Sequence, residues 1–172
     1  MNKAERTLVL LKPDAVQRNL VGEITTRFER VGLKIVGMKL VLPTKAQTYT
    51  HYGINPNLPQ AILDQLANFL SASPVIAMVL EGNKAIPVVR KMIGSTEPLQ
   101  SNPGTIRGDF TLDSYDLADK DKRSVRNLVH ASSSQEDALK EIKVWFKKGE
   151  LVDYMSIRER ILYDINLDNI LE

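Results

Sequence analysis

The segment Thr7-Leu-Val-Leu-Leu-Lys-Pro-Asp14 sets the start of the fold, because its short apolar run ends at a lysine and a proline. The run is too short for a helix and is followed by turn-forming residues, so it predicts a buried strand over residues 7–11. Apolar residues then recur at helical spacing from Leu20 to Val31, and Gly32 follows as a helix stop. The chain therefore begins with a strand and a helix.

Outward from this segment, strands and helices continue to alternate. Side chains alternate in type over residues 33–42, and a largely apolar run covers 74–81, so both stretches predict strands. Helical periodicity follows each strand, and Pro87 is compatible with its helix because it lies in the first turn. The predicted helices cover residues 43–51, 59–71 and 85–93.

The second half of the chain begins with a long loop. Residues 94–108 are rich in Gly, Pro, Ser, Thr and Asn, and long loops in compact domains usually carry function. A helical turn is predicted around residues 115–122, and a strand over 125–131. Ser133-Ser134-Gln135-Glu136 fits a capping box and predicts the start of a last helix, which Lys147-Lys148-Gly149 end.

The resulting order is strand, helix, strand, two helices, strand, helix, loop, strand and helix. A split βαβ arrangement, with helices on one face of an antiparallel sheet, is the economical way to close that order. A doubly wound parallel sheet would need more regular alternation. The sequence therefore predicts an α+β, ferredoxin-like fold with one core domain.

Composition limits the class of protein. The 172 residues are 43% hydrophobic and 26% charged, which suits a globular domain with a substantial core and excludes overall disorder. The longest apolar run, Val75 to Leu80, is far shorter than the roughly 20 residues of a membrane helix, and no secretory signal is recognisable. The lack of cysteine excludes disulfides and thiolate zinc sites, and two histidines do not make a His-rich metal site. We therefore expect a cytoplasmic protein.

The charge pattern argues against nucleic acid as a partner. The 23 basic and 21 acidic residues give a net charge of +2, and the two signs are interspersed. A nucleic-acid binder usually has a basic stripe, and a sheet that binds single strands needs exposed aromatic residues. The predicted strands contain no Phe, Tyr or Trp. Small anionic ligands stay possible, because they need only a few well-placed cations.

Several common enzyme motifs are missing from the chain. It has no G-x-x-x-x-G-K-[ST], no G-x-S-x-G, no H-E-x-x-H, no EF-hand loop and no protein-kinase signature. These absences argue against a P-loop enzyme, a serine hydrolase, a zincin and a protein kinase.

His130 is the first candidate for chemistry, because it lies at the end of a predicted strand and just before a helix N-terminus. Free N–H groups at a helix start attract anions, and a neutral imidazole is a good nucleophile toward phosphorus. On its position alone, the more common case is a histidine that packs under a loop and bonds a carbonyl.

Three basic residues and a threonine lie in or near the long loop and at the end of the first predicted strand. Guanidinium groups bind phosphate oxygens bidentately, and a threonine hydroxyl adds a neutral donor. Most loop arginines are solvated surface charges, and a lysine at a strand end often only extends into solvent. The candidates for anion binding are Lys12, Arg90, Thr96 and Arg107.

Three segments together resemble the nucleoside diphosphate kinase family. They are Glu5 to Arg18, Pro103 to Phe110, and Arg126 to Ser132, the last followed by Glu141-Ile142 and Trp145-Phe146. The resemblance covers roughly residues 5 to 147, with the segments in the family's order. It implies a ferredoxin-like fold and an enzyme that moves a γ-phosphoryl group from a nucleoside triphosphate such as ATP to a nucleoside diphosphate by ping-pong kinetics.

The resemblance also implies roles for individual residues. His130 matches the phosphorylated nucleophile, with Glu141 and Ser132 supporting it and Tyr52 beside it. Mg²⁺ is expected to arrive on the nucleotide phosphates, and the family's tetramers or hexamers imply a homo-oligomer. The residues matching positions that hold phosphates and ribose are Lys12, Arg90, Thr96, Arg107 and Asn127.

The chain departs from the family pattern at its base pocket and beside the nucleophile. Ile62 or Leu58 must take the place of the phenylalanine that usually stacks on the base, and nucleotide affinity is expected to fall by about 1 kcal/mol. Ala131 replaces the glycine that usually follows the histidine, which requires a negative φ there. These two changes motivate an alternative function, a nucleotide-binding regulatory protein with weak turnover.

Two further departures concern the length of the chain. An insertion over about residues 111–125 lies within a predicted kinase-like domain of residues 1–149. An amphipathic extension over residues 150–172 is expected to pack on the domain or on a neighbouring subunit. Its residues available for docking are Ile161, Leu162, Ile165 and Leu167.

Overall fold

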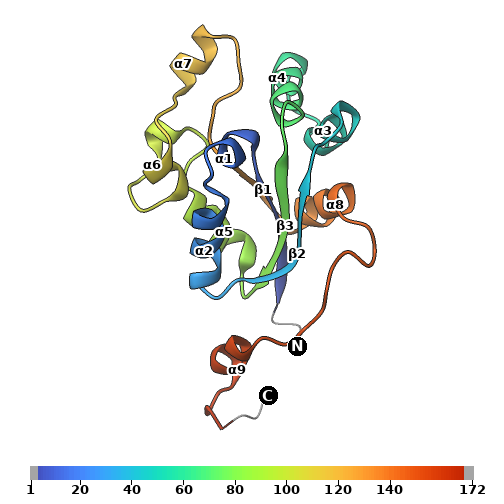
Figure 1. Ribbon diagram of the computed structural model, residues 1–172, viewed down its shortest axis with the longest axis vertical. Coiled ribbons are helices and arrows are strands. Elements are labelled where there is room, and N and C mark those ends of the chain that lie inside the picture. The colour runs from blue at the N-terminus through green and yellow to red at the C-terminus, as the bar shows by residue number, and fades with distance from the viewer. Residues whose placement is uncertain (1–3, 169–172) are drawn as a thin grey trace.

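The computed structural model describes residues 4–168 as a layered α/β structure built on one sheet (Figure 1). The ends of the predicted domain and extension, residues 1–3 and 169–172, lie outside the described residues. The sheet is antiparallel, and its strands follow the order β2-β3-β1-β4. This order confirms the predicted α+β, split βαβ fold. The strands are β1 (Glu5–Leu11), β2 (Lys34–Val41), β3 (Val75–Gly82) and β4 (Val129–Ala131).

Helices cover both faces of the sheet, so the prediction of helices on one face alone is wrong. Leu8 and Leu10 of β1 pack toward Trp145 of α8, whereas Val9 and Leu11 pack toward α2 and α5 on the opposite face. The apolar run of β1 is uninterrupted because both faces of this central strand are buried. The longer helices are α2 (Val21–Arg30), α3 (Lys45–Tyr52), α4 (Gln60–Leu70), α5 (Ala85–Ile93) and α8 (Gln135–Trp145).

Shorter helices fill the connections. α1 follows β1 directly, and the predicted loop over residues 94–108 contains a 3₁₀ turn and the start of α6. The helical turn predicted within the insertion is present as α7. The shorter elements are α1 (Pro13–Gln17), the 3₁₀ turn η1 (Pro98–Gln100), α6 (Ile106–Phe110), α7 (Tyr115–Lys120) and α9 (Ile157–Tyr163).

Two predicted boundaries differ from the structure. The last strand begins only at Val129, because Leu128 has a φ of 65° and interrupts the extended backbone. The last helix is capped by Ser134, whose hydroxyl accepts the backbone N–H of Asp137 at 3.1 Å. The predicted capping box is therefore wrong by one residue, since Ser133 lies outside the cap.

The chain after α8 crosses the end of the sheet and is held mainly by polar contacts. Val152 donates its N–H to the Val36 carbonyl at 2.8 Å, and Lys34 pairs with Glu159 at 2.9 Å. The apolar side chains of Ile161 and Ile165 stay exposed, at 67% and 69%. Leu162 and Leu167 are exposed as well. No helix within residues 4–168 is long and apolar enough to cross a membrane.

Candidate active site

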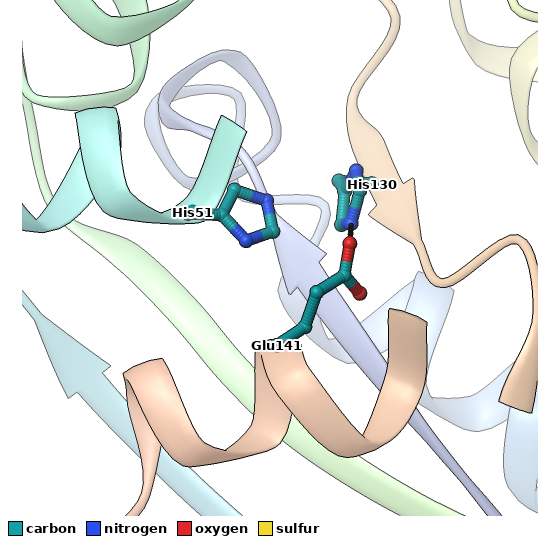
Figure 2. A group of neighbouring side chains, drawn as sticks. All are labelled: His51, His130 and Glu141. Carbon is teal, nitrogen blue, oxygen red and sulfur yellow. Dashed lines mark hydrogen bonds and ion pairs between the residues drawn. The ribbon is translucent and has the colours of Figure 1, made fainter. Parts of the chain in front are cut away.

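His130 stands on the edge strand β4, where it pairs with Leu10 of β1. Its Nε2 lies 2.9 Å from Glu141 Oε1 on α8, as Figure 2 shows, and the other ring nitrogen points away from that carboxylate. The hydroxyl of Ser132 donates to Glu141 Oε2 at 2.6 Å and accepts the Leu8 N–H at 3.2 Å. Glu141 is thus fixed to the sheet, and it favours the tautomer of His130 that carries its proton on Nε2. Nδ1 is left with a free lone pair.

A tight backbone turn places this strand. Leu128 has a φ of 65°, a region that a bulky side chain rarely occupies, and Val129 N–H closes the turn on the Asn127 carbonyl at 2.7 Å. The Leu128 N–H donates to Asp14 Oδ2 at 3.0 Å, and its carbonyl accepts the Lys12 N–H at 2.8 Å. The unusual backbone is therefore held from the end of β1, and it directs Asn127 and His130 to the same side.

Lys12 is buried at the end of β1, with 4% of its surface exposed. Its Nζ donates to Asn127 Oδ1 at 2.7 Å, and Asn127 Nδ2 donates to the Thr96 carbonyl at 2.7 Å. Burial, and then the charge of Arg107, lower the pKa of Lys12 from 10.5 to about 8. The site therefore contains a cation that is costly to bury and that bonds no carboxylate within residues 4–168.

Arg107 of α6 ties the loop to the strand. It donates to the carbonyls of Gly94 and Ser95 at 2.9 and 2.8 Å, and to those of Asn127 and Val129 at 3.1 and 2.6 Å. Four of its five N–H groups are thereby used, so at most one is left for a ligand. Burial, and then Arg90, lower the pKa of Arg107 to about 10, and the guanidinium stays charged at neutral pH.

A cleft of about 870 Å³ opens over His130. Arg90 is exposed in it and makes no hydrogen bond or ion pair with the rest of residues 4–168. Ile62 of α4 lines the same cleft and is 39% exposed, with Leu58 nearby and the insertion opposite, where Tyr115 faces it. The cleft therefore combines the cations Lys12, Arg90 and Arg107 with acidic residues of α8, and its side along α4 is largely aliphatic.

The predicted site residues lie together. Every one of them lines this cleft except Ser132, which is behind Glu141. Ala131 has extended backbone in β4, pairs with Val9 and does not adopt a positive φ, so the alanine needs no strained conformation. The predicted residues in the cleft are Lys12, Tyr52, Ile62, Arg90, Thr96, Arg107, Asn127, His130 and Glu141.

Two aromatic residues at the end of α3 lie beside His130. The buried hydroxyl of Tyr52 has no hydrogen-bond partner within residues 4–168, and burial followed by the charge of Glu141 raises its pKa. The His51 ring meets the His130 ring edge to face, with centroids 4.4 Å apart. Sequence reasoning missed His51, although it is the only other histidine and ends a predicted helix.

His51, His130 and Glu141 form a group that could in principle hold a metal, since one donor atom from each lies within 4.8 Å of the others. However, the indole N–H of Trp145 donates to His51 Nδ1 at 3.3 Å. In a neutral imidazole that accepts at Nδ1, the proton is on Nε2, which then has no lone pair for a metal. The hydrogen bonding of His51 therefore opposes metal binding, and the donor set is unlike the oxygen ligands that Mg²⁺ prefers.

A family model described as nucleoside diphosphate kinase matches residues 5–151. The chain belongs to the nucleoside diphosphate kinase family. A member from Pyrococcus abyssi is 48% identical over 153 residues, which cover 89% of this chain and 91% of the relative. One from Staphylococcus epidermidis is 44% identical over 160 residues, covering 93% and 99%.

Solved structures of the nucleoside diphosphate kinase family share the fold. A transition state mimic of the Borrelia burgdorferi enzyme, with bound vanadate and ADP, superimposes with a TM-score of 0.88 at 41% identity and covers 91% of this chain and 95% of that one. The Halobacterium salinarum enzyme in complex with CDP gives a TM-score of 0.80 at 37% identity, covering 92% and 98%. The family and the fold expected from the three sequence segments are thus confirmed.

Within this nucleoside diphosphate kinase fold, Ile62→Phe is expected to tighten ADP binding about fivefold, because a ring can stack on the base where an aliphatic chain only touches it. Isothermal titration calorimetry measures the change. Leu99→Phe is the matched control, since Leu99 is 67% exposed and lies outside the cleft. Equal ADP affinity in Ile62→Phe and the unmodified protein would show that the base does not lie against α4.

Proposed function

We propose that the chain transfers the γ-phosphoryl group from a nucleoside triphosphate to a nucleoside diphosphate through a phosphohistidine on His130. The observation that carries this proposal is the bond between His130 Nε2 and Glu141, which leaves Nδ1 as the free nucleophilic nitrogen in a cleft that also holds Lys12, Arg90 and Arg107. A general base is not needed, because the attacking lone pair carries no proton.

In the first half-reaction, the Nδ1 lone pair of His130 attacks the γ-phosphorus of the triphosphate. The bond between that phosphorus and the β–γ bridging oxygen breaks, and the diphosphate leaves with the electron pair. Positive charge develops on the imidazole as the N–P bond forms, and the Glu141 carboxylate at Nε2 stabilises it. The Nε2 proton stays between the two side chains.

The second half-reaction is the reverse with another nucleotide. A terminal oxygen of the acceptor diphosphate attacks the phosphorus on His130, and the N–P bond breaks with its electron pair returning to Nδ1. One imidazole can serve both steps because it is a nucleophile and a leaving group. A single cleft then binds donor and acceptor in turn, which gives ping-pong kinetics.

The cations of the cleft suit the phosphates of the substrate. Among the described residues, no carboxylate bonds the donors of Lys12 and Arg90, and Arg107 adds a fixed charge nearby. Such groups neutralise charge on the transferred phosphoryl group. Mg²⁺ enters as part of the nucleotide complex, since it favours substrate phosphates over a dedicated protein cage.

Further parts of the proposal rest on the family resemblance. Residues 1–149 form the catalytic domain, with the insertion near residues 111–125, and residues 150–172 form an extension. The protein acts as a homo-oligomer, and the exposed apolar residues Ile157 and Ile161 of α9 are in keeping with burial against another copy. The cysteine-free composition is in keeping with a cytoplasmic location.

A direct test is incubation with ATP labelled at the γ-phosphorus, followed by gel filtration. We expect label on His130 that is lost in acid and stable in base, and that passes completely to added GDP. The acid lability follows from an N–P bond at an imidazole, and the transfer to GDP follows from a site that binds its substrate through the phosphates. Tight ADP binding without any labelled protein would instead support the regulatory alternative motivated by Ile62 and Ala131.

A further inference from the structure

His51 is a buried polar residue that the reaction described above does not use. Only 2% of it is exposed, and its Nδ1 accepts the Trp145 indole N–H at 3.3 Å. Its Nε2 is buried and has no hydrogen-bond partner within residues 4–168. An unpaired buried donor costs about 1–3 kcal/mol, so a histidine at this position calls for an explanation beyond filling the core.

The His51 ring stands edge-on against the face of the His130 ring. The centroids are 4.4 Å apart and the planes meet at 84°, an arrangement that Figure 2 shows with the His51 edge directed at His130. The Trp145 ring meets His51 in a similar geometry from the other side, at 5.7 Å and 79°. The His51 ring therefore packs between the core residue Trp145 and His130.

The bond to Glu141 restrains the rotation of the His130 ring only in part. Within residues 4–168, His130 makes a single side-chain hydrogen bond, at Nε2. Rotation about the Cβ–Cγ bond displaces Nε2 less than Nδ1, because Nε2 lies closer to the rotation axis, so a small rotation shifts Nδ1 while the bond to Glu141 only bends. This torsion is broad for histidine and is not fixed by ordinary rotamer preferences. Contact with the face of the ring is what limits the rotation.

We propose that His51, oriented by Trp145, is a positioning residue that fixes the plane of the His130 ring and so directs the Nδ1 lone pair at the γ-phosphorus. This inference rests on the proposed phosphorylation of His130. The partial positive edge of a neutral His51 ring also favours the electron-rich face of a neutral His130. An in-line displacement depends on such alignment, and a misplacement of about 1 Å can cost a hundredfold in rate.

His51 stays neutral in this role. Burial, and then the neighbouring His130 and Lys12, lower the pKa of His51 well below its ordinary 6.5. The ring therefore keeps one tautomer across the physiological pH range, with the proton on Nε2 and Nδ1 bonded to Trp145. A ring that changed charge or tautomer would lose either the indole bond or its contact with His130.

The test is the single-turnover rate of His130 phosphorylation at saturating ATP, measured by quench-flow, together with ADP affinity. His51→Ala is expected to lower the rate constant about 10- to 100-fold while ADP affinity changes less than about twofold. His51→Phe restores a flat ring against His130 and is expected to regain a rate within about fivefold of the unmodified protein. Trp145→Phe keeps the core filled but removes the indole N–H, and a drop of about threefold or more is expected.

Thr48→Val is the matched control, because Thr48 is fully buried on the same helix and its hydroxyl donates to the Ala67 carbonyl at 3.2 Å, away from His130. It is expected to lower the melting temperature and leave the rate unchanged. The inference is overturned if His51→Ala phosphorylates at the normal rate, if His51→Phe is as slow as His51→Ala, or, should His51→Ala not fold, if Trp145→Phe is fully active. Absence of phosphorylation in the unmodified protein would instead contradict the proposed function.

Discussion

Replacing His130 with alanine is expected to lower nucleotide phosphotransfer by at least about four orders of magnitude and to remove the labelled phosphoprotein completely. The two ring side chains packed beside His130 are poorly suited to replace it as nucleophiles. Its closest aromatic neighbours are His51, which has its lone pair bonded to Trp145, and Tyr52, whose phenol is buried and has a raised pKa. A coupled assay with ATP and a second nucleoside diphosphate measures the loss.

Nucleotide binding separates loss of chemistry from loss of structure in this variant. The side chain of His130 is 21% exposed, and the groups that hold phosphates in the proposal, Lys12 and Arg90, do not depend on it for hydrogen bonds. His130→Ala is therefore expected to fold and to bind ADP within about threefold of normal. Lys143→Ala, on the solvent side of α8, is the control variant and is expected to keep normal activity. Full activity in His130→Ala would exclude the phosphohistidine route.

The fold was largely predictable because its strands carry strong local signals. The runs at residues 8–11 and 75–80 are apolar without interruption, and each lies in the middle of the sheet. The periodicity of α2 and α5 also follows from burial of one face. Coverage of both sheet faces was not predicted, because periodicity marks the buried side of a helix and not the sheet face that it covers.

The short strand β4 shows where local signals fail. The preceding residues 125–128 resemble a strand in sequence, but Leu128 has a positive φ and is held by bonds to Asp14 and Lys12 from a distant part of the chain. The capping error at Ser133 has a similar cause, since Ser134 was an equally good cap and tertiary packing decides between them. Such choices depend on contacts that sequence spacing does not encode.

The candidate site was predictable as a set of residues but not as a set of contacts. The resemblance marked Arg107 as a phosphate ligand, yet the structure uses most of its donors on four backbone carbonyls. His51 had no sequence signal beyond being the second histidine. Its relation to His130 arises because the end of α3 meets β4, across 79 residues of sequence separation that include the whole of β3.

Lys12→Met is expected to lower the kcat/KM for ATP by about two to three orders of magnitude, which corresponds to loss of a charge-assisted contact in a buried site. Methionine keeps much of the lysine volume and removes the charge. In the free protein, burial and Arg107 lower the pKa of Lys12 to about 8, so part of the Lys12 population is neutral near that pH. Bound phosphates favour the charged form, so this neutral fraction must take up a proton when the nucleotide binds. Calorimetry in buffers of different ionisation enthalpy should detect proton uptake on ADP binding at pH 8, and affinity should fall as the pH rises from 8 to 10.

Lys12→Met should lower activity but should not lower the free energy of unfolding. Because the folded protein binds the Lys12 proton more weakly than the unfolded chain, the buried charge costs on the order of 3 kcal/mol below pH 8, and this cost disappears as the pH rises toward 10.5. Lys12→Met should therefore be at least as stable as the unmodified protein at pH 7, despite losing the bond to Asn127, and its advantage should shrink between pH 8 and 10.5.

A second lysine provides the contrast for this prediction. Lys34 is also largely buried, but its pKa is raised, because its bonds to Glu81 and Glu159 outweigh the effect of burial. Lys34→Met should lose stability at pH 7 and keep normal kcat/KM, since Lys34 lies outside the cleft. Equal destabilisation in Lys12→Met and Lys34→Met would show that burying the Lys12 charge is not costly. ADP binding without proton uptake at pH 8 would show that phosphate does not raise the pKa of Lys12.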